Sequence, residues 1–441
     1  MKKESFIIEG LAGKKTLKGK IKINGAKNAA LKAMAAAVLF DGLVELHNIP
    51  NTEDIDTMSK ILMKLGAKVE RPDHSLSIDP STITSTTIDS KLAGVMRASV
   101  VLTGPLLARF GKASFPTPGG CVIGARPIDQ FVKGYKEMGA NVSEDDRNYT
   151  IEMMRDRNNN RSPITNIQFE KKTVGGTETL MMAAVLGNGT VTLNNCAQEP
   201  EIVNVAEWLN ECGALIKGVG TEKIIIKGTC GKLLSPKVPY VAIPDRIEAG
   251  SYLILGALCA SGLTIENCRA DHLGSLVDLL KKSGVPIEVS PNSISIKGNT
   301  ESNSAFRSFD VSTKEYPGFA TDFQPQIVTY LTQISGDSTV NENIYEGRFK
   351  YVDDLQRMGA KIELSGSNRV SIHGPCTLDQ LPVGEDLCAH DIRAGFAIVM
   401  AALVGKGSFT VNNTYFIDRG YEKLEERLCA LGVNIRRVQS K

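Results

Sequence analysis

The chain has 441 residues, and its 51 Lys and Arg nearly balance its 49 Asp and Glu, giving a net charge of +2. This balance argues against a partner held by bulk charge, such as nucleic acid or an anionic membrane surface. Hydrophobic residues make up 42% of the chain and charged residues 23%, which is typical of a globular protein with a large core. Length alone favours about three domains.

The sequence gives no sign of a membrane segment, a metal site or a disulfide framework. There is no run of about 18 apolar residues, and the opening MKKESFIIEGLAGKK lacks the apolar core of a signal peptide. Nine cysteines are scattered without CxxC spacing, and five histidines form no metal-ligand spacing. We therefore expect reduced thiols in the cytoplasm, and neither a zinc site nor most histidine-based chemistry.

A glycine marker recurs six times along the chain. Each copy follows a helix-like stretch, and most precede an alternating, strand-like stretch; the glycines are Gly66, Gly139, Gly213, Gly284, Gly359 and Gly432. The intervals between them are 73, 74, 71, 75 and 73 residues. Glycine ends helices well because it adopts positive φ at little cost. The spacing predicts six copies of an α/β unit, the alternative being ordinary α/β packing with coincidental spacing.

Other parts of the unit recur around the marker. An apolar helix rich in small residues is expected before most markers, at 29–40, 100–110, 180–186, 251–260 and 395–404. A short β-rich run often follows it, and a second helix then leads to the marker. An alternating strand is expected 12 or 13 residues beyond the marker, at 75–78, 149–151, 223–227, 293–297 and 369–373. The unit therefore reads βαβαββ.

The last marker, Gly432, is too near the C-terminus to be followed by its final strand. Residues 5–10 resemble residues 293–298, so we expect the N-terminal strand to complete the last unit. The chain would then cross between two lobes near 22–27 and again near 240–247. This predicts lobe one from residues 1–24 and 244–441 and lobe two from residues 25–243, with three units in each.

Asn24-Gly25-Ala26-Lys27-Asn28-Ala29-Ala30 directly precedes a helix of small residues. The N–H groups at a helix N-terminus favour an anion, and Lys27 adds a positive charge. The segment is not a Walker loop, because GxxxxGK[ST] is absent. The alternative is a solvated lysine in a turn.

One loop, at residues 116–127, frames a single cysteine and a single arginine with three prolines and three glycines. Such a loop is a poor candidate for core, so Cys121 differs from Cys196, Cys259 and Cys268, which fit small buried hydrophobes. A cation lowers the pKa of a nearby thiol, and Cys121 could serve as a general acid or nucleophile. Burial in the core remains the alternative for Cys121 as well.

Several arginines stand apart from charge runs, next to apolar or small residues; they are Arg97, Arg348, Arg393 and Arg419, with Arg126 in the cysteine loop. Arginine in such places often binds a carboxylate or phosphate with two hydrogen bonds. Five of them on both sides of the 240–247 crossing suggest an anionic ligand held between the lobes. The alternative is internal ion pairing, for instance to Asp391 or Asp418.

Two acidic segments allow a functional and a structural interpretation. Asp322 lies among apolar neighbours in FATDFQPQ, where its pKa could be tuned for work as a base. A helix N-cap is the competing interpretation. For Asp245-Arg246-Ile247-Glu248 we favour a structural ion-pair cluster near the interlobe crossing.

Together these segments resemble the enolpyruvyl transferase family, and the resemblance runs essentially from end to end. The matching segments are NGAKNAAL (24–31), MRAS (96–99), PGGCVIGARPID (118–129), EPEIV (199–203), PDRIEAG (244–250), FATDFQPQ (319–326), YEGRF (345–349), DIRA (391–394) and IDRGYE (417–422). The resemblance implies a two-lobed, inside-out α/β barrel of the α+β type, built from six βαβαββ repeats. It also implies transfer of the enolpyruvyl group of phosphoenolpyruvate to the 3-hydroxyl of UDP-N-acetylglucosamine, with release of phosphate. That reaction opens peptidoglycan synthesis and needs no metal, no cofactor and no obligate protein partner.

The resemblance also implies roles for individual residues. Cys121 would give a proton to C3 of phosphoenolpyruvate and react with fosfomycin, and Asp322 would accept the proton of the 3-hydroxyl; Lys27 and Arg419 complete the catalytic set. The residues implied to bind phosphoenolpyruvate are Lys27, Asn28, Arg126, Arg348, Arg393 and Arg419. Those implied to contact the sugar nucleotide are Asn28, Arg97, Arg126, Pro127, Ile128, Asp129, Gln130, Lys171, Lys172, Thr173, Val174, Asp322 and Ile344.

The chain departs from the family pattern on the nucleotide side. Gln130-Phe131 stands where leucine and histidine are common, and Lys171-Lys172-Thr173-Val174 replaces a segment that often has serine before valine. Two other functions remain open. One is enolpyruvyl transfer to shikimate 3-phosphate or UMP, and the other is a non-catalytic relative that binds the sugar nucleotide and regulates wall synthesis.

Overall fold

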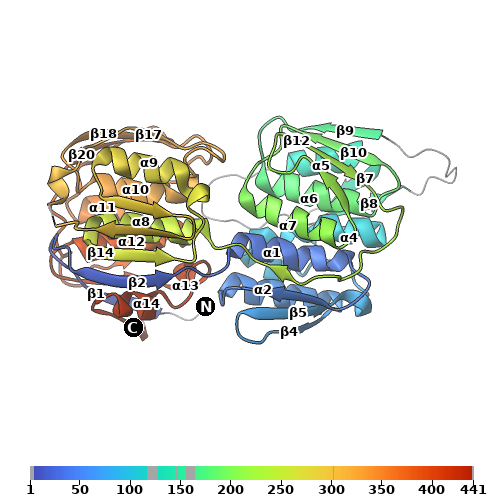
Figure 1. Cartoon of the computed structure of the whole chain (residues 1–441), viewed down its shortest axis with the longest axis horizontal. Coiled ribbons are helices and arrows are strands. Elements are labelled where there is room, and N and C mark those ends of the chain that lie inside the picture. The colour runs from blue at the N-terminus through green and yellow to red at the C-terminus, as the bar shows by residue number, and fades with distance from the viewer. Residues whose placement is uncertain (1–3, 117–127, 146–147, 155–163, 301, 440–441) are drawn as a thin grey trace. The chain divides into compact units, whose positions relative to one another are not determined.

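A computed structural model describes residues 4–116, 128–145, 148–154, 164–300 and 302–439 of the chain. These residues form two compact units. Unit one comprises residues 4–24 and 244–439, and unit two comprises the described residues of 25–243. In the described part of the chain each unit contains three β-sheets and a hydrophobic core of its own (Figure 1).

The three sheets of unit one have the strand orders β21-β22-β1-β23, β15-β16-β14-β2 and β17-β18-β20-β19. Their strands are β1 (Glu4–Glu9), β2 (Leu17–Lys22), β14 (Ala260–Glu266), β15 (Ile287–Ser290), β16 (Ser293–Lys297), β17 (Val311–Ser312), β18 (Gly336–Asn341), β19 (Ile362–Ser365), β20 (Arg369–Gly374), β21 (Leu387–Cys388), β22 (Ser408–Asn412) and β23 (Ile435–Gln439). The helices are α8 (Arg246–Cys259), α9 (Gly274–Ser283), α10 (Gln324–Leu331), α11 (Val352–Arg357), α12 (Ile392–Val404), α13 (Tyr415–Asp418) and α14 (Leu424–Ala430).

The sheets of unit two have the orders β13-β3-β5-β4, β11-β12-β10-β9 and β6-β8-β7. Their strands are β3 (Val44–His47), β4 (Lys68–Glu70), β5 (Ser75–Asp79), β6 (Lys112–Pro116), β7 (Ala140–Glu144), β8 (Asn148–Met153), β9 (Ile164–Gln168), β10 (Thr190–Asn194), β11 (Leu215–Lys217), β12 (Lys223–Lys227) and β13 (Tyr240–Val241). The helices are α1 (Lys27–Ala36), α2 (Glu53–Leu65), α3 (Ser90–Val95), α4 (Thr103–Phe110), α5 (Asp129–Glu137), α6 (Val174–Val185) and α7 (Pro200–Glu211).

Each unit has helices at its centre and sheets around them. In unit one, α8, α10 and α12 contact one another, and each also contacts a different sheet (Figure 1). Every residue of α10 is buried, as is nearly every residue of α8 and α12. In unit two, α1, α4 and α6 contact the sheets of β3, β6 and β10. A helix that is apolar on all sides must be enclosed, so the small-residue helices form the interior of an inside-out barrel.

The predicted βαβαββ repeat is present. Residues 164–227 run β9-α6-β10-α7-β11-β12, in which β9 and β10 are parallel and β12 is antiparallel to both β10 and β11. Each four-stranded sheet contains one parallel pair of strands. A helical crossover joins the strands of the pairs β9–β10, β17–β18 and β21–β22, whereas the pairs β2–β14 and β3–β13 bring together distant parts of the chain. The third sheet of unit two has three strands and a parallel bridge between Thr87 and Ser114 at the corresponding place. The predicted fold class, a two-lobed α/β protein of six repeats, is confirmed.

Three strands join parts of the chain that are far apart in sequence. β1 lies between β22 and β23 and is antiparallel to both. β2, which precedes α1, is parallel to β14, whereas β13, which precedes α8, is parallel to β3. β2 therefore completes the sheet of β14, the strand that follows α8. In the same way, β13 completes the sheet of β3, the strand that follows α1. Both β2 and β13 lie where the chain passes from one unit to the other.

All six marker glycines have positive φ, with values of 108°, 91°, 110°, 109°, 107° and 94° in chain order. Gly66 ends α2 and Gly284 ends α9 as left-handed C-caps. The strands expected beyond the markers are β5, β8, β12, β16 and β20. The reason given for glycine at these positions, a backbone conformation that other residues rarely adopt, is therefore confirmed.

Candidate functional site

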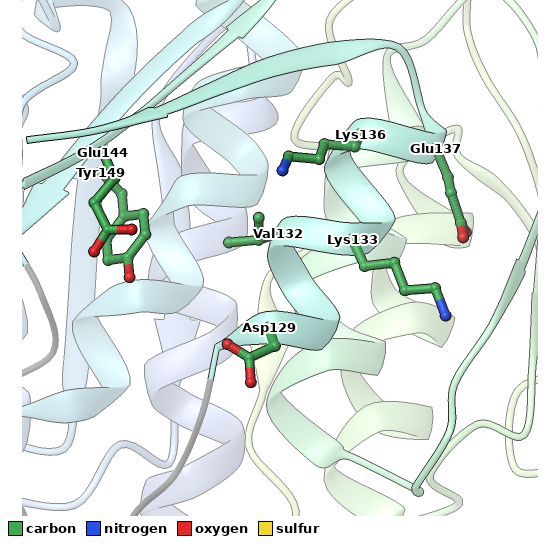
Figure 2. A pocket seen from close by; sticks show the side chains of 7 residues that line it. All are labelled: Asp129, Val132, Lys133, Lys136, Glu137, Glu144 and Tyr149. Carbon is green, nitrogen blue, oxygen red and sulfur yellow. The ribbon is translucent and has the colours of Figure 1, made fainter.

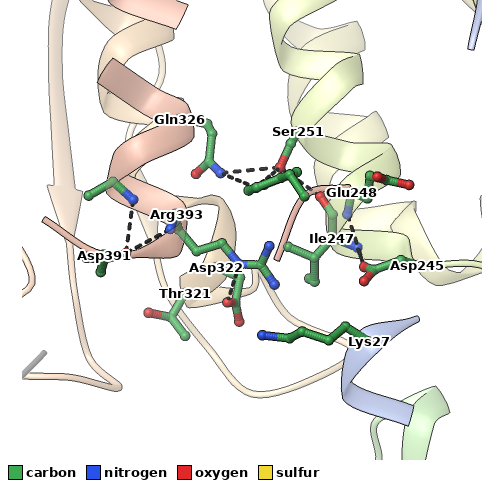
Figure 3. Close-up of polar contacts among 12 residues, drawn as sticks. Lys27, Asp245, Ile247, Glu248, Ser251, Thr321, Asp322, Gln326, Asp391 and Arg393 are labelled. Carbon is green, nitrogen blue, oxygen red and sulfur yellow. Dashed lines mark hydrogen bonds and ion pairs between the residues drawn. The ribbon is translucent and has the colours of Figure 1, made fainter. Parts of the chain in front are cut away.

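In unit one, Asp322 lies directly before α10, in the 3-10 turn Thr321–Phe323, and accepts a hydrogen bond from Arg393 (Figure 3). Its Oδ1 lies 3.0 Å from Nε of Arg393 and 3.7 Å from Nη2 of Arg348. The side chains of Arg348 and Arg393 are 2% and 4% exposed, whereas that of Asp322 is 33% exposed. Two buried guanidinium groups therefore share one partly open carboxylate.

The protonation state of Asp322 follows from this pairing. Burial by itself would raise the pKa of the carboxyl, but the charges of Arg393 and Arg348 outweigh burial and hold the pKa well below its usual range. Asp322 does not act as a helix N-cap, since neither the 3-10 turn Thr321–Phe323 nor α10 has a side-chain cap. Among our two interpretations the N-cap is wrong. The expected tuning toward a base is also not observed in this state, because the pKa moves down.

Arg393 lies in the first turn of α12, Arg348 lies in a turn before α11, and both guanidinium groups lie near aromatic rings. Asp391 caps α12 by accepting hydrogen bonds from the N–H groups of Arg393 and Ala394, at 2.8 and 3.0 Å (Figure 3). The guanidinium of Arg393 lies 5.4 Å from the centre of the Tyr421 ring, and that of Arg348 lies 5.5 Å from the Tyr345 ring. The alternative of internal ion pairing is therefore present for Arg393, but its partner is Asp322 rather than Asp391 or Asp418.

Both guanidinium groups retain donor capacity. Nη1 of Arg393 and Nε of Arg348 are buried and donate no hydrogen bond within the described residues. Unpaired buried donors are costly, so a bound anion would stabilise this arrangement.

In unit two, Lys27 is the first residue of α1 and is not solvated. Its Nζ lies 2.9 Å from Oδ2 of Asp54 in the first turn of α2, and the two side chains are 7% and 5% exposed. Asn28 follows on the same turn and is half-buried. The solvated-lysine alternative is therefore wrong, and the positive charge at the start of α1 is held in place by a carboxylate.

A second buried pair in unit two was not anticipated from the sequence. Nζ of Lys32 in α1 lies 2.8 Å from Oε2 of Glu178 in α6, and the side chains are 11% and 1% exposed. Burial raises the pKa of Glu178 to about 7, against the lowering effect of Lys32. The sequence does contain a signal for this pair, because Lys32 and Glu178 are charges of opposite sign that lie among apolar residues of their helices.

The two segments expected on the nucleotide side lie together in unit two. Oε1 of Gln130, in the first turn of α5, accepts hydrogen bonds from the N–H groups of Glu170 and Lys171, at 3.1 and 3.4 Å. Thr173 caps α6 through Gly176, and Nζ of Lys172 lies 2.7 Å from Glu222. Gln130, one of the departures from the family pattern, is thus the residue that joins segment 128–130 to segment 171–174.

The remaining predicted site residues occupy separate elements. Arg97 begins the 3-10 helix Arg97–Leu102, Arg419 directly follows α13, and Ile344 follows β18. Cys121, Arg126 and Pro127 lie outside the described residues. Asp245 caps α8 through the N–H groups of Ile247 and Glu248 (Figure 3). Glu248 forms an ion pair with Arg427, which confirms the structural interpretation of the DRIE segment.

A surface cavity of about 570 Å³ lies in unit two between α5 and the β7–β8 hairpin. Figure 2 shows the side chains that line it: Asp129, Val132, Lys133, Lys136, Glu137, Glu144 and Tyr149. Only Asp129 belongs to the predicted site, and Lys133 is paired with Glu170. This cavity is therefore separate from the buried charges described above.

Within the described ranges, no group of three or more His, Cys, Asp or Glu side chains could hold a metal ion. No helix of the described part is long and apolar enough to cross a membrane. The eight described cysteines are free, and Cys196, Cys259 and Cys268 are buried as expected.

A family model for EPSP synthase (3-phosphoshikimate 1-carboxyvinyltransferase) matches residues 11–428. The chain belongs to this family of enolpyruvyl transferases. Among curated relatives, the UDP-N-acetylglucosamine 1-carboxyvinyltransferase of Desulforapulum autotrophicum is 40% identical over 97% of this chain and 99% of its own length. The enzyme of that name from Koribacter versatilis is 41% identical, over 99% and 96%.

Solved structures of enolpyruvyl transferases share the fold. The enolpyruvyl transferase NikO from Streptomyces tendae superposes with a TM-score of 0.86 at 22% identity, covering all of both chains. EPSP synthase from Acinetobacter baumannii gives a TM-score of 0.69 at 15% identity, covering 99% of this chain and 100% of that one.

Proposed function

We propose that this enolpyruvyl transferase moves the enolpyruvyl group of phosphoenolpyruvate to the 3-hydroxyl of UDP-N-acetylglucosamine and releases phosphate. The observation that carries the proposal is about 40% identity, over nearly the whole chain, to relatives that bear the name of this activity. The reaction opens peptidoglycan synthesis. Free thiols throughout the described residues favour a reducing compartment such as the cytoplasm.

The reaction is an addition followed by an elimination. The 3-hydroxyl oxygen bonds to C2 of phosphoenolpyruvate while C3 accepts a proton, and the hydroxyl proton passes to a base. The tetrahedral adduct then loses phosphate from C2 and a proton from C3, which restores the double bond. We assign Cys121 as the acid at C3 and Asp322 as the base at the hydroxyl, because C3 must receive a proton while the oxygen that attacks the adjacent C2 loses one.

Fixed cations are needed because phosphoenolpyruvate carries about three negative charges. We assign its binding to Lys27, Asn28, Arg126, Arg348, Arg393 and Arg419. The unused donors of Arg348 and Arg393 support this assignment. We assign contacts with the sugar nucleotide to Asn28, Arg97, Arg126, Pro127, Ile128, Asp129, Gln130, Lys171, Lys172, Thr173, Val174, Asp322 and Ile344.

The lowered pKa of Asp322 is compatible with its assigned work as a base. The charges of Arg393 and Arg348 lower the pKa of Asp322 and keep its carboxylate ionised. When an anionic substrate shares these guanidinium groups, it offsets part of their charge, and the pKa of Asp322 rises. The carboxylate therefore gains basicity only when phosphoenolpyruvate is bound.

The decisive test is phosphate release from phosphoenolpyruvate with three separate acceptors. We expect release with UDP-N-acetylglucosamine and none with shikimate 3-phosphate or UMP. Release only with one of the latter two would overturn the acceptor assignment. No release with any of the three would favour a non-catalytic regulator.

The assignment of Cys121 has its own test. Fosfomycin is expected to label the wild-type chain covalently at one site, detected by intact-protein mass spectrometry. Cys121→Ser should remove the label, whereas Cys230→Ser, which changes an exposed free thiol of unit two, should keep it. Labelling that persists in Cys121→Ser would show that another thiol reacts.

A further inference from the structure

Glu342, which directly follows β18, is a buried carboxylate without an assigned role. The residue is 2% exposed, and its carboxylate accepts four hydrogen bonds. Oε1 accepts from Oγ1 of Thr313 at 2.9 Å and from the N–H groups of Ile344 and Tyr345 at 2.9 and 3.0 Å. Oε2 accepts from Oγ1 of Thr321 at 2.8 Å. A single carboxylate therefore ties together three segments of unit one.

Thr321 connects Glu342 to Arg348, the arginine near Asp322, by hydrogen bonds. Its hydroxyl has one hydrogen, which is donated to Glu342, so its oxygen is left as an acceptor. Nη1 of Arg348 donates to that oxygen at 2.6 Å, and Nη2 of the same guanidinium lies 3.7 Å from Asp322. Arg348 therefore donates a hydrogen bond to Thr321, and Thr321 in turn donates one to Glu342.

The other side of Glu342 fixes the loop after β18. The N–H groups that it accepts belong to Ile344, assigned to the sugar nucleotide, and to Tyr345, whose ring lies 5.5 Å from the Arg348 guanidinium. Glu342 thus determines the place of Arg348 from two directions, through a hydroxyl and through an aromatic ring. Its negative charge also offsets part of the charge of Arg348, which would otherwise act fully on Asp322.

We propose that Glu342 is a positioning residue for the transfer reaction, which orients Arg348 against Asp322 through the hydroxyl of Thr321. The proposal rests on the enolpyruvyl transfer put forward above. Glu342 touches no reacting atom. It acts by keeping Thr321 an acceptor toward Arg348, so that the guanidinium is shared between Thr321, Asp322 and the substrate anion.

The chain offers a matched pair of substitutions for the test. Thr321 and Thr313 are both buried, and both donate a hydroxyl to Glu342 at nearly equal distances. Thr313 makes no hydrogen bond to Arg348 within the described residues; its hydroxyl oxygen instead accepts from the N–H of Asn343 at 2.8 Å. Thr321→Val and Thr313→Val therefore remove the same chemical group from the same carboxylate, but only the first breaks the connection to Arg348.

We expect Thr321→Val to lower kcat at least tenfold with both substrates saturating, and Thr321→Ser to restore it to within about threefold of the wild type, because loss of a hydrogen bond to a charged group has effects of this order. Thr313→Val should keep kcat within about threefold, although it loses at least as much thermal stability as Thr321→Val. Glu342→Gln, which keeps the shape but replaces an acceptor by a donor, should lower kcat like Thr321→Val. Because both changes break one relay, the double variant should be little worse than either single variant.

If the role of Glu342 were structural only, the two threonine variants would change kcat alike. If Thr313→Val and Thr321→Val lower kcat equally, or if the losses in the double variant simply multiply, Glu342 does not act through Thr321 and the proposal is overturned. Wild-type phosphate release with UDP-N-acetylglucosamine is measured in the same assay. Its absence would overturn the proposed function itself, so the two failures are distinct.

Discussion

The two units bury charge in different proportions. In unit one, Arg348 and Arg393 share the single carboxylate of Asp322, and each guanidinium keeps a buried N–H without a partner in the described residues. In unit two, each buried lysine has its own carboxylate, Lys27 with Asp54 and Lys32 with Glu178. The units share one architecture but pair their buried cations differently. Unit one has two guanidinium groups for one carboxylate, whereas unit two has one carboxylate for each lysine.

The difference follows from the chemistry of the side chains. A guanidinium has five donors in a planar fork, so it can hold a carboxylate and still present hydrogen bonds to a second anion. An ammonium has three donors around one compact charge, so a second anion must approach the same small group that the first carboxylate already holds. Unit one therefore offers an anion more donors per carboxylate than unit two does.

The largest effect should come from the carboxylate that unit one shares. Asp322→Asn removes the assigned base, and we expect kcat for phosphate release to fall by about 10²- to 10⁴-fold. Asp353→Asn, which changes an exposed carboxylate in α11 of the same unit, should leave kcat within about twofold. A loss of less than tenfold in Asp322→Asn would remove Asp322 from proton transfer.

Lys27 should combine a catalytic and a structural loss, unlike the arginines of unit one. Lys27→Met leaves Asp54 buried without its cation, so we expect the free energy of unfolding in urea to fall by about 3–5 kcal/mol. The double variant with Asp54→Leu should recover most of that stability, because no lone charge remains buried. Phosphate release should stay low in both variants. Recovery of activity in the double variant would show that Lys27 serves only the fold.

The Lys32–Glu178 pair should make the stability of unit two depend on pH. The pKa of Glu178 is about 7 in the folded chain and about 4.3 in an unfolded one, so the folded state holds the proton more tightly. The contribution of Glu178 to the free energy of unfolding is therefore greatest below about pH 4.3 and falls as the pH rises to about 7.

Removing Lys32 should strengthen this dependence, since Lys32 lowers the pKa of Glu178. We expect Lys32→Leu to destabilise the chain by about 3–5 kcal/mol at pH 8 and clearly less at pH 5, where Glu178 takes up a proton. The double variant Lys32→Leu with Glu178→Leu should lose the pH-dependent part. Equal destabilisation by Lys32→Leu at both pH values would contradict the raised pKa.

The repeat could be predicted because its signal is local and physical. A glycine with positive φ recurs at a near-constant interval, and the alternation of β12 and β16 is visible in five residues each. The central helix of the fifth repeat, α10, was missed because Gln324, Gln326 and Thr329 make it look polar. All three are fully buried, and Gln326 donates to Ser251 and Tyr421 of the neighbouring elements.

The partners of the site residues could not be predicted in the same way. Candidate charges such as Lys27 and Arg393 stand out one by one, but their carboxylates lie 27 and 71 residues away in sequence. The pairing depends on which helix starts meet in three dimensions, and no periodicity carries that information. Nothing in the sequence marks Glu342 as a candidate, because its role follows from four hydrogen bonds that form only in the folded chain.

The smallest effects should distinguish the two units at the glycine markers. Gly432 in unit one and Gly66 in unit two have similar φ values of 94° and 108°, so alanine costs about 1–2 kcal/mol in backbone conformation at either site. A Cβ at Gly432 would meet no atom within 4 Å, whereas at Gly66 it would lie 2.7 Å from the carbonyl oxygen of Thr82. Backbone cannot move aside as a side-chain end can. We therefore expect Gly66→Ala to lower the free energy of unfolding more than Gly432→Ala does, measured by urea denaturation. Equal losses would mean that backbone conformation alone explains why glycine occupies the marker position.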